Sequence, residues 1–167
     1  MEPVTAYLAL GANLGDRLGQ LQGARSALAA AGGIRVTAAS PLYETGPVGG
    51  PPGQPPYLNA VLRVETTLSC RALLELCLAV EVRFGRRRQE PWSPRTLDVD
   101  LLFFGGETLD EPGLVVPHPR LHQRRFVLTP LADLDPELLH PALGRSVLQL
   151  LTALDNGESV RLYAREW

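Results

Sequence analysis

The chain has 167 residues, of which 45% are apolar, and a formal net charge of −2 at pH 7. This length and composition predict a single soluble domain, residues 1–167, with enough apolar surface for a core of its own. The charge is close to neutral, so nothing overall favours a nucleic acid or an anionic membrane as partner.

The N-terminal residues lack the basic segment and the long apolar run of a signal peptide, and no stretch of sequence is suited to span a bilayer. Residues 4–10 read as a buried strand that leads into a Gly-rich turn at residues 11–16. Asp16 then suits the N-cap of a helix that runs to about Ala31. The turn lacks the Lys-Ser/Thr of a P-loop and the glycine spacing of a dinucleotide site, so we interpret it as structural. Because the sequence shows neither a signal peptide nor a membrane span, we expect a cytoplasmic protein.

Residues 34–39 and 57–66 read as the second and third strands. Between them, residues 41–56 contain ten Pro or Gly among sixteen residues, which predicts a long loop. One face of the third strand carries only apolar residues, whereas the other begins with Tyr57 and Asn59. A flat ring beside an amide could recognise a planar heterocycle. The alternative is an edge tyrosine next to a turn asparagine.

Ser69 is a predicted cap for a second helix that runs to about residue 83. Cys70 and Cys77 lie on this helix about 10 Å apart along its axis, too far for a disulfide, and their spacing matches no metal motif. We expect both to be reduced thiols in or near the core.

The most informative stretch is residues 97–104, an apolar strand that contains Asp98 and Asp100. Alternation sends Leu97, Val99, Leu101 and Phe103 to one face and places the two carboxylates together on the other, with Cα atoms roughly 6.6 Å apart. Divalent cations between the carboxylates and a polyphosphate would relieve their repulsion. The preceding segment is strongly cationic, since it holds Arg83, Arg86, Arg87, Arg88 and Arg95. Together they predict a site for a metal-bound polyphosphate. The alternative is an exposed acid pair beside a solvated arginine loop.

The order strand-helix-strand-strand-helix-strand predicts an α+β fold with a ferredoxin-like βαββαβ core, in which helices pack on one face of an antiparallel sheet. Beyond this core we expect a turn or hairpin at residues 105–110, short helices near residues 127–134 and 146–154, and an extra edge strand at residues 160–163. A second cationic segment, with His118, Arg120, Arg124 and Arg125, could fold back over the acid strand and hold phosphate oxygens. Solvated arginines on a surface helix are the alternative.

Residues 94–102, Pro-Arg-Thr-Leu-Asp-Val-Asp-Leu-Leu, preceded by Gly85-Arg86-Arg87-Arg88 and Trp92, resemble the 6-hydroxymethyl-7,8-dihydropterin pyrophosphokinases of folate biosynthesis. The likeness continues in the same order through residues 8–16, 43–45, 54–59, 116–118 and 124–126. The resemblance implies an enzyme that transfers the diphosphate of ATP to the pterin hydroxymethyl group, releases AMP and uses two Mg²⁺ ions. We also expect the protein to be a monomer.

The resemblance also implies a role for individual residues. The expected metal ligands are Asp98 and Asp100, which with Arg86 and Arg95 form the expected catalytic set. The positions expected near ATP are Glu81, Arg86, Arg88, Trp92, Arg95, His118 and Arg124. The positions expected near the pterin are Thr45, Val48, Tyr57, Asn59, Trp92 and Phe126.

The chain departs from the family pattern at Pro91, where a basic residue is common, and at Ser93, where Gly or Ala is usual. Two other functions fit parts of the sequence. A different Mg²⁺-dependent phosphotransferase could use the same acid pair, and a ferredoxin-like RNA-binding module could use the arginines. The RNA-binding module usually carries paired aromatic residues on its central strands, where this chain has Asp98 and Asp100.

Overall fold

The computed structural model describes residues 2–46, 55–84, 97–155 and 157–167. The elements in chain order are β1 (Val4–Ala12), α1 (Arg17–Ala30), β2 (Ile34–Ala39), β3 (Leu42–Thr45), β4 (Tyr57–Thr66), α2 (Cys70–Phe84), β5 (Asp98–Phe104), β6 (Leu109–Glu111), β7 (Leu114–Val116), a 3₁₀ turn η1 (Leu121–Gln123), α3 (Arg125–Leu134), α4 (Val147–Ala153) and β8 (Val160–Ala164).

An antiparallel sheet of six strands forms the centre of the molecule, in the order β5-β1-β4-β3-β8, with β2 also paired to β4. Strand β4 runs along β1 for its whole length, and β2 and β3 follow one another along its other edge. The predicted ferredoxin-like order is therefore confirmed. The extra edge strand expected at residues 160–163 is also present, since β8 pairs with β3.

The long loop predicted for residues 41–56 is wrong at its start, because Leu42–Thr45 is strand β3. Between β2 and β3 the chain stays paired with β4, because Ser40, just before Pro41, forms two hydrogen bonds with Val61 of β4. The Ser40 backbone N–H donates to the Val61 carbonyl at 2.9 Å, and the Ser40 hydroxyl accepts from the Val61 N–H at 2.9 Å. The side chain thus extends the ladder next to a proline that has no N–H to donate.

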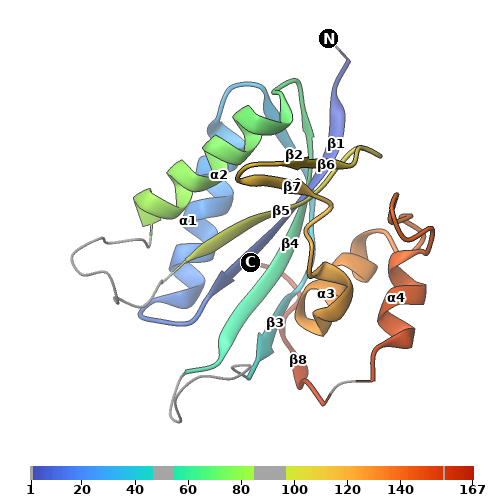
Figure 1. Cartoon of the computed structure of the whole chain (residues 1–167). Coiled ribbons are helices and arrows are strands. Elements are labelled where there is room, and N and C mark those ends of the chain that lie inside the picture. Colours follow the sequence, from blue (N-terminus) through green and yellow to red (C-terminus); the bar gives the residue numbers. More distant parts are fainter. Residues whose placement is uncertain (1, 47–54, 85–96, 156) are drawn as a thin grey trace.

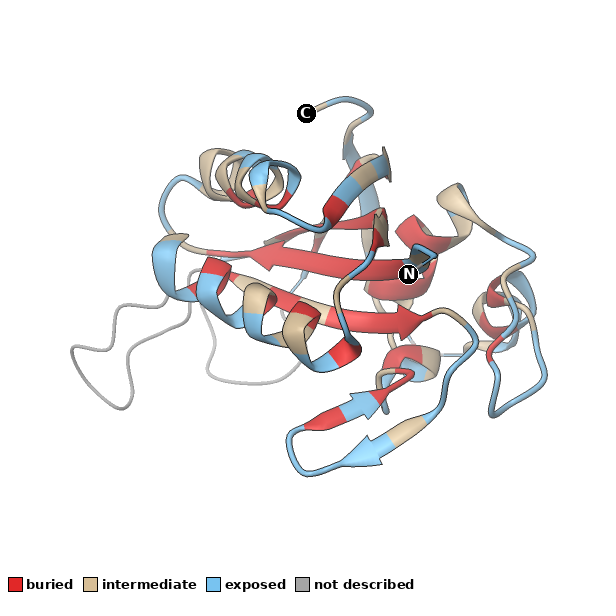
Figure 2. Ribbon diagram, turned by 90° about the horizontal axis from the view of Figure 1, so that it is seen from above, coloured by how far each residue is buried: buried red, intermediate tan, exposed pale blue. Residues whose placement is uncertain are grey.

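Two helical layers enclose the sheet (Figure 1). Helices α1 and α2 cover one face, as expected of the ferredoxin-like core, and share one apolar cluster with it. The short C-terminal helices α3 and α4 cover the opposite face and form a second cluster with it. The central strands are consequently buried on both sides, as the red ribbon between the helices in Figure 2 shows. Helices α3 and α4 thus pack on the face of the sheet opposite to α1 and α2.

Strand β5 contains a bulge that changes which way its last residues point. Leu101 lies opposite Leu8 and Phe103 lies opposite Tyr7, so Leu102 is an extra residue between them. The prediction that Phe103 shares a face with Leu101 is therefore wrong, because Phe103 packs in the α3–α4 cluster, edge-on to Tyr7 at 6.1 Å. The acid pair precedes the bulge, so its alternation is unaffected.

A buried hydroxyl ties the end of α3 to the sheet. The Tyr7 hydroxyl donates to the carboxylate of Asp135, which also accepts from the Arg63 guanidinium at 3.1 and 3.2 Å. Burial and the neighbouring Asp135 carboxylate raise the pKa of Tyr7, so the hydroxyl keeps its proton and acts as the donor. These bonds hold the C-terminal layer against the far end of β1 and β4.

The predicted helix caps and thiols are confirmed. Asp16 accepts from the Gly19 N–H at 3.0 Å, and the Ser69 hydroxyl accepts from the Ala72 N–H at 3.1 Å. Cys70 and Cys77 are free and buried, and burial raises the pKa of the Cys77 thiol to about 12. Among the described residues, no helix is long and apolar enough to cross a bilayer.

Candidate active site

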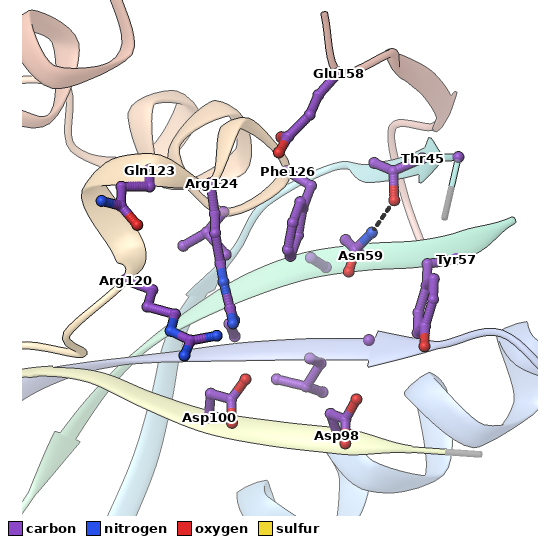
Figure 3. Close-up of a pocket in the computed structure, with 16 residues that line it drawn as sticks. Thr45, Tyr57, Asn59, Asp98, Asp100, Arg120, Gln123, Arg124, Phe126 and Glu158 are labelled. Carbon is purple, nitrogen blue, oxygen red and sulfur yellow. Dashed lines mark hydrogen bonds between the residues drawn. The ribbon is translucent and has the colours of Figure 1, made fainter. Parts of the chain in front are cut away.

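The acid pair lies at the open end of β5, as its alternation predicts. Asp98 and Asp100 are partly exposed and point into one cleft, whereas Val99 between them is 3% exposed and faces the core (Figure 3). The carboxyl-bearing face and the apolar face are thus separated by the pleat of one strand. Placing two carboxylates side by side creates a local negative charge suited to a cation.

A buried glutamate fixes the strand at this point. Among the described strands β5 lies at an edge of the sheet, with β1 as its neighbour on the inner side. The Glu81 carboxylate on α2 accepts the N–H of Val99 at 2.9 Å and is itself only 4% exposed. Glu81 therefore positions the segment between the two aspartates. It also lines a second cavity of about 410 Å³ together with Asp100 and His118.

The cleft in front of the acids has a volume of about 430 Å³ and draws on strands, the start of α3 and the C-terminal segment. This volume is in the range of small-molecule sites. Its lining includes most of the polar residues discussed below and several apolar ones. The full set is Ala9, Leu10, Gly11, Thr45, Gly46, Tyr57, Asn59, Ala60, Asp98, Asp100, Arg120, Gln123, Arg124, Phe126, Val127 and Glu158.

One end of the cleft combines two aromatic rings with a buried amide, an arrangement that suits a flat polar molecule. The rings of Tyr57 and Phe126 stand on either side of the Asn59 side chain in Figure 3. Asn59 is 7% exposed, and its amide nitrogen donates to the Thr45 hydroxyl at 2.7 Å, which fixes the orientation of the amide. Tyr57 lines the same cleft as Asp98, and burial, followed by the charge of Asp98, raises the pKa of Tyr57.

Gly11 on β1 is the strand position that lets these groups meet. It lies opposite Asn59 on one side and opposite Asp98 on the other. A Cβ at this position would lie 2.9 Å from the Asn59 side-chain oxygen, which is closer than real Cβ contacts. The interpretation of residues 11–16 as purely structural is therefore incomplete, because Gly11 belongs to the strand and lines the cleft.

The second cationic segment does fold back over the acid strand. Arg120 and Arg124 line the cleft and point from the η1–α3 region toward the acids in Figure 3. The Arg124 guanidinium also lies over the Phe126 ring, 5.7 Å from its centroid. Arg125 turns elsewhere, since its guanidinium donates to the Leu154 carbonyl at 3.1 Å. The prediction of phosphate-facing arginines thus fits Arg120 and Arg124 but not Arg125.

His118, at the start of the same segment, is neutral at physiological pH because its pKa is lowered. Burial, followed by the charges of Arg124 and Arg120, lowers its pKa to about 4. Its Nδ1 accepts from the Arg120 N–H at 3.1 Å, so Nδ1 carries no proton in this arrangement. The ring lines the cavity of about 410 Å³ rather than the first cleft.

Several expected site residues lie outside the described part of the chain, namely Val48, Arg86, Arg88, Trp92 and Arg95. The cleft also contains residues that the sequence did not indicate as site residues, among them Gly11, Gln123 and Glu158. A glycine inside an apolar strand is a signal of close approach and could have indicated Gly11. No comparable signal exists for Glu158, which reaches the cleft from the far end of the chain.

Comparison with known proteins gives consistent results. The model of the 7,8-dihydro-6-hydroxymethylpterin-pyrophosphokinase family matches residues 7–136. Proteins named 2-amino-4-hydroxy-6-hydroxymethyldihydropteridine pyrophosphokinase are similar over most of the chain. The one from Synechocystis is 42% identical over 90% of this chain and 76% of its own length. The one from Methylorubrum extorquens is 43% identical, over 90% and 93%, and that from Pseudomonas aeruginosa 45%, over 88% and 90%.

Solved structures share the fold at low sequence identity. A crystal structure titled as an HPPK-DHPS in complex with substrates superposes with a TM-score of 0.73 and 12% identity, over 92% of this chain and 43% of that chain. A Plasmodium falciparum HPPK-DHPS gives a TM-score of 0.71 and 17% identity, over 90% and 44%. The chain thus spans less than half the length of these two solved chains. At this sequence identity the comparison supports a shared fold and nothing more.

Proposed function

This chain belongs to the 7,8-dihydro-6-hydroxymethylpterin-pyrophosphokinase family, and on that premise we infer its reaction. It transfers the diphosphate of ATP to the hydroxymethyl group of 6-hydroxymethyl-7,8-dihydropterin, giving AMP and the pterin diphosphate in folate biosynthesis. The observation that carries this inference is the family match over residues 7–136, a range that includes Asp98 and Asp100. We also propose that residues 1–167 act as one pyrophosphokinase domain and as a monomer.

The acid pair suits Mg²⁺, and we propose that Asp98 and Asp100 hold two Mg²⁺ ions. Both side chains offer only oxygen ligands and open into the same cleft. Among the described residues, no group of three or more His, Cys, Asp or Glu forms a closed metal site. That fits Mg²⁺, which commonly takes one or two carboxylates and fills its other positions with water and phosphate oxygens. When bound, the metal would neutralise phosphate charge and polarise phosphoryl oxygens.

We propose that the pterin binds between the rings of Tyr57 and Phe126. Both aromatic residues and the buried Asn59 line the cleft. The pterin is a flat ring with hydrogen-bonding atoms along one edge, so stacking supplies affinity and Asn59 supplies direction. Thr45 serves by holding the Asn59 amide. By the family resemblance, Val48, which lies outside the described residues, is also expected near the pterin.

The phosphates of ATP would lie between the aspartates and the cationic segment. Arg124 points into the cleft toward the acids, and His118 and Glu81 line the adjoining cavity beside Asp100. Arginine is suited to phosphate because its planar fork donates two parallel hydrogen bonds. By the family resemblance, Arg86, Arg88, Arg95 and Trp92 complete this site. Arg86 and Arg95 would stabilise the bridging oxygen as AMP leaves.

What these residues contribute to the reaction is position and charge. Tyr57, Phe126 and Asn59 would orient the pterin so that its hydroxymethyl oxygen meets the β-phosphorus, which converts a bimolecular encounter into a local one. The cationic side chains would stabilise the charge that spreads over phosphate oxygens in the transition state. No general base is assigned to the hydroxymethyl proton.

One assay tests this function directly. The pure protein is incubated with ATP, Mg²⁺ and the hydroxymethyl pterin, and the nucleotide products are separated. We expect one AMP for each pterin diphosphate, and no turnover when Mg²⁺ is replaced by EDTA. Accumulation of ADP would point to a different phosphotransferase, and turnover without any pterin would contradict the assigned acceptor.

A further inference from the structure

The C-terminal segment contributes an acid to the pterin end of the cleft. Glu158 lies between α4 and β8, and its side chain lines the cleft with Thr45, Asn59 and Phe126. In Figure 3 it descends from the C-terminal ribbon toward the first turn of α3. It lies at the end of the cleft away from Asp98 and Asp100, so it does not belong to the proposed metal site.

Glu158 caps a helix that has no cap of its own. Helix α3 begins at Arg125, and its N-cap residue Arg124 makes no side-chain capping bond. Instead, the Glu158 carboxylate accepts the N–H of Arg125 at 3.0 Å. A carboxylate at this position also interacts favourably with the positive end of the helix dipole.

A second bond joins the same two segments. The Arg125 guanidinium donates to the Leu154 carbonyl at 3.1 Å, at the end of α4. Residue 125 is therefore held both through its backbone N–H and through its side chain. Both partners lie about thirty residues further along the chain. The side chain of the N-cap residue Arg124 makes no capping hydrogen bond of its own.

Residue 125 lies between two cleft residues, the N-cap residue Arg124 and Phe126 in the first turn of α3. The Arg124 guanidinium lies over the Phe126 ring. Fixing the backbone of Arg125 thus fixes the start of the helix that carries the aromatic wall. We propose that Glu158 is a positioning residue that sets Phe126 against the pterin through the Arg125 N–H. This rests on the proposed function.

Removing the cap should weaken pterin binding by a defined amount. A side-chain N-cap contributes about 1 kcal/mol, which corresponds to roughly a fivefold change in an equilibrium constant. If Phe126 stacks on the pterin only when α3 starts in this position, that factor appears in the KM for the pterin. The chemical step uses groups at the other end of the cleft, so kcat should change less than twofold.

The experiment compares Glu158→Ala with Glu158→Gln, because glutamine keeps an oxygen that can accept the same N–H. AMP formation is measured with the pterin varied at saturating ATP and Mg²⁺. We expect the KM for the pterin to rise about fivefold in Glu158→Ala and to stay within twofold of wild type in Glu158→Gln. Glu137→Ala, which removes an exposed acid just beyond α3, is the charge-matched control and should leave both constants unchanged.

Two results would overturn the proposal. An unchanged pterin KM in folded Glu158→Ala would show that the cap does not position Phe126. Equal losses in the Ala and Gln variants would show that the negative charge, not the hydrogen bond, is what the site uses. If Glu158→Ala fails to fold, Glu158→Asp, whose side chain is one methylene shorter, must show the same rise in KM. Wild-type turnover in the same assay tests the function separately.

Discussion

Gly11→Ala should disturb the proposed pterin end of the cleft through its contact with Asn59. The added Cβ would lie 2.9 Å from the Asn59 side-chain oxygen, and ordinary contact begins at about 3.4 Å, so the amide must move by about 0.5 Å. Asn59 cannot move freely, because its nitrogen is bonded to the Thr45 hydroxyl at 2.7 Å and the residue is 7% exposed.

The size of the effect follows from that bond. Weakening one buried hydrogen bond and displacing its amide costs about 1–2 kcal/mol, or roughly a five- to thirtyfold rise in the KM for the pterin. The global fold should be little affected, since alanine is favoured over glycine in a strand by about 0.5–1 kcal/mol. The assay is AMP formation with the pterin varied, together with urea unfolding.

A double-mutant cycle isolates the clash from other effects. In the Asn59→Ala background the amide is absent, so Gly11→Ala should add almost nothing to the loss already present. Gly32→Ala is the matched control, because a Cβ there would meet no atom within 4 Å. Full additivity of Gly11→Ala and Asn59→Ala, or a normal KM in the single variant, would refute the reasoning.

Three further predictions concern other parts of the molecule. If the two aspartates hold Mg²⁺ as proposed, Asp98→Ala and Asp100→Ala should each reduce Mg²⁺-dependent AMP formation about 100-fold or more. The unfolding midpoint should not fall, because each substitution removes one of two neighbouring like charges. His118 has a folded-state pKa of about 4, below its ordinary value of 6.5, so unfolding stability should fall as pH drops from about 6.5 toward 4. His118→Asn should show a smaller drop in urea titrations at pH 7 and pH 4.5. Asp135→Ala should cost about 1–3 kcal/mol of unfolding free energy, because it leaves the buried Tyr7 hydroxyl without its acceptor.

Each of these has a control and a contrary outcome. Asp155→Ala removes an exposed acid outside the cleft and should keep full activity, whereas an active Asp98→Ala enzyme would contradict the metal-binding proposal. For the histidine, equal acid sensitivity in wild type and His118→Asn would show that its protonation does not destabilise the fold. For the Tyr7–Asp135 hydrogen bond, Asp155→Ala again serves as the control. An unchanged unfolding midpoint in Asp135→Ala would mean that water replaces the lost acceptor.

Local sequence was sufficient where one strand or helix decides the outcome. The face shared by Asp98 and Asp100 follows from alternation within β5, and the caps at Asp16 and Ser69 follow from their immediate neighbours. The order of helices and strands was enough to predict the ferredoxin-like sheet. The resemblance over several ordered motifs predicted the family.

Only the tertiary structure decided features that depend on a partner distant in sequence. The bulge that turns Phe103 to the α3–α4 side appears only when β5 is aligned with β1. The closeness of Gly11 to Asn59 requires β1 and β4 to lie in register, and the reach of Glu158 to Arg125 requires α3 and the C-terminal segment to meet. Alternation and capping are set by bonds within a few residues, so the sequence contains them directly. Register, bulges and contacts across about thirty residues depend on how whole elements pack, and no local pattern encodes that.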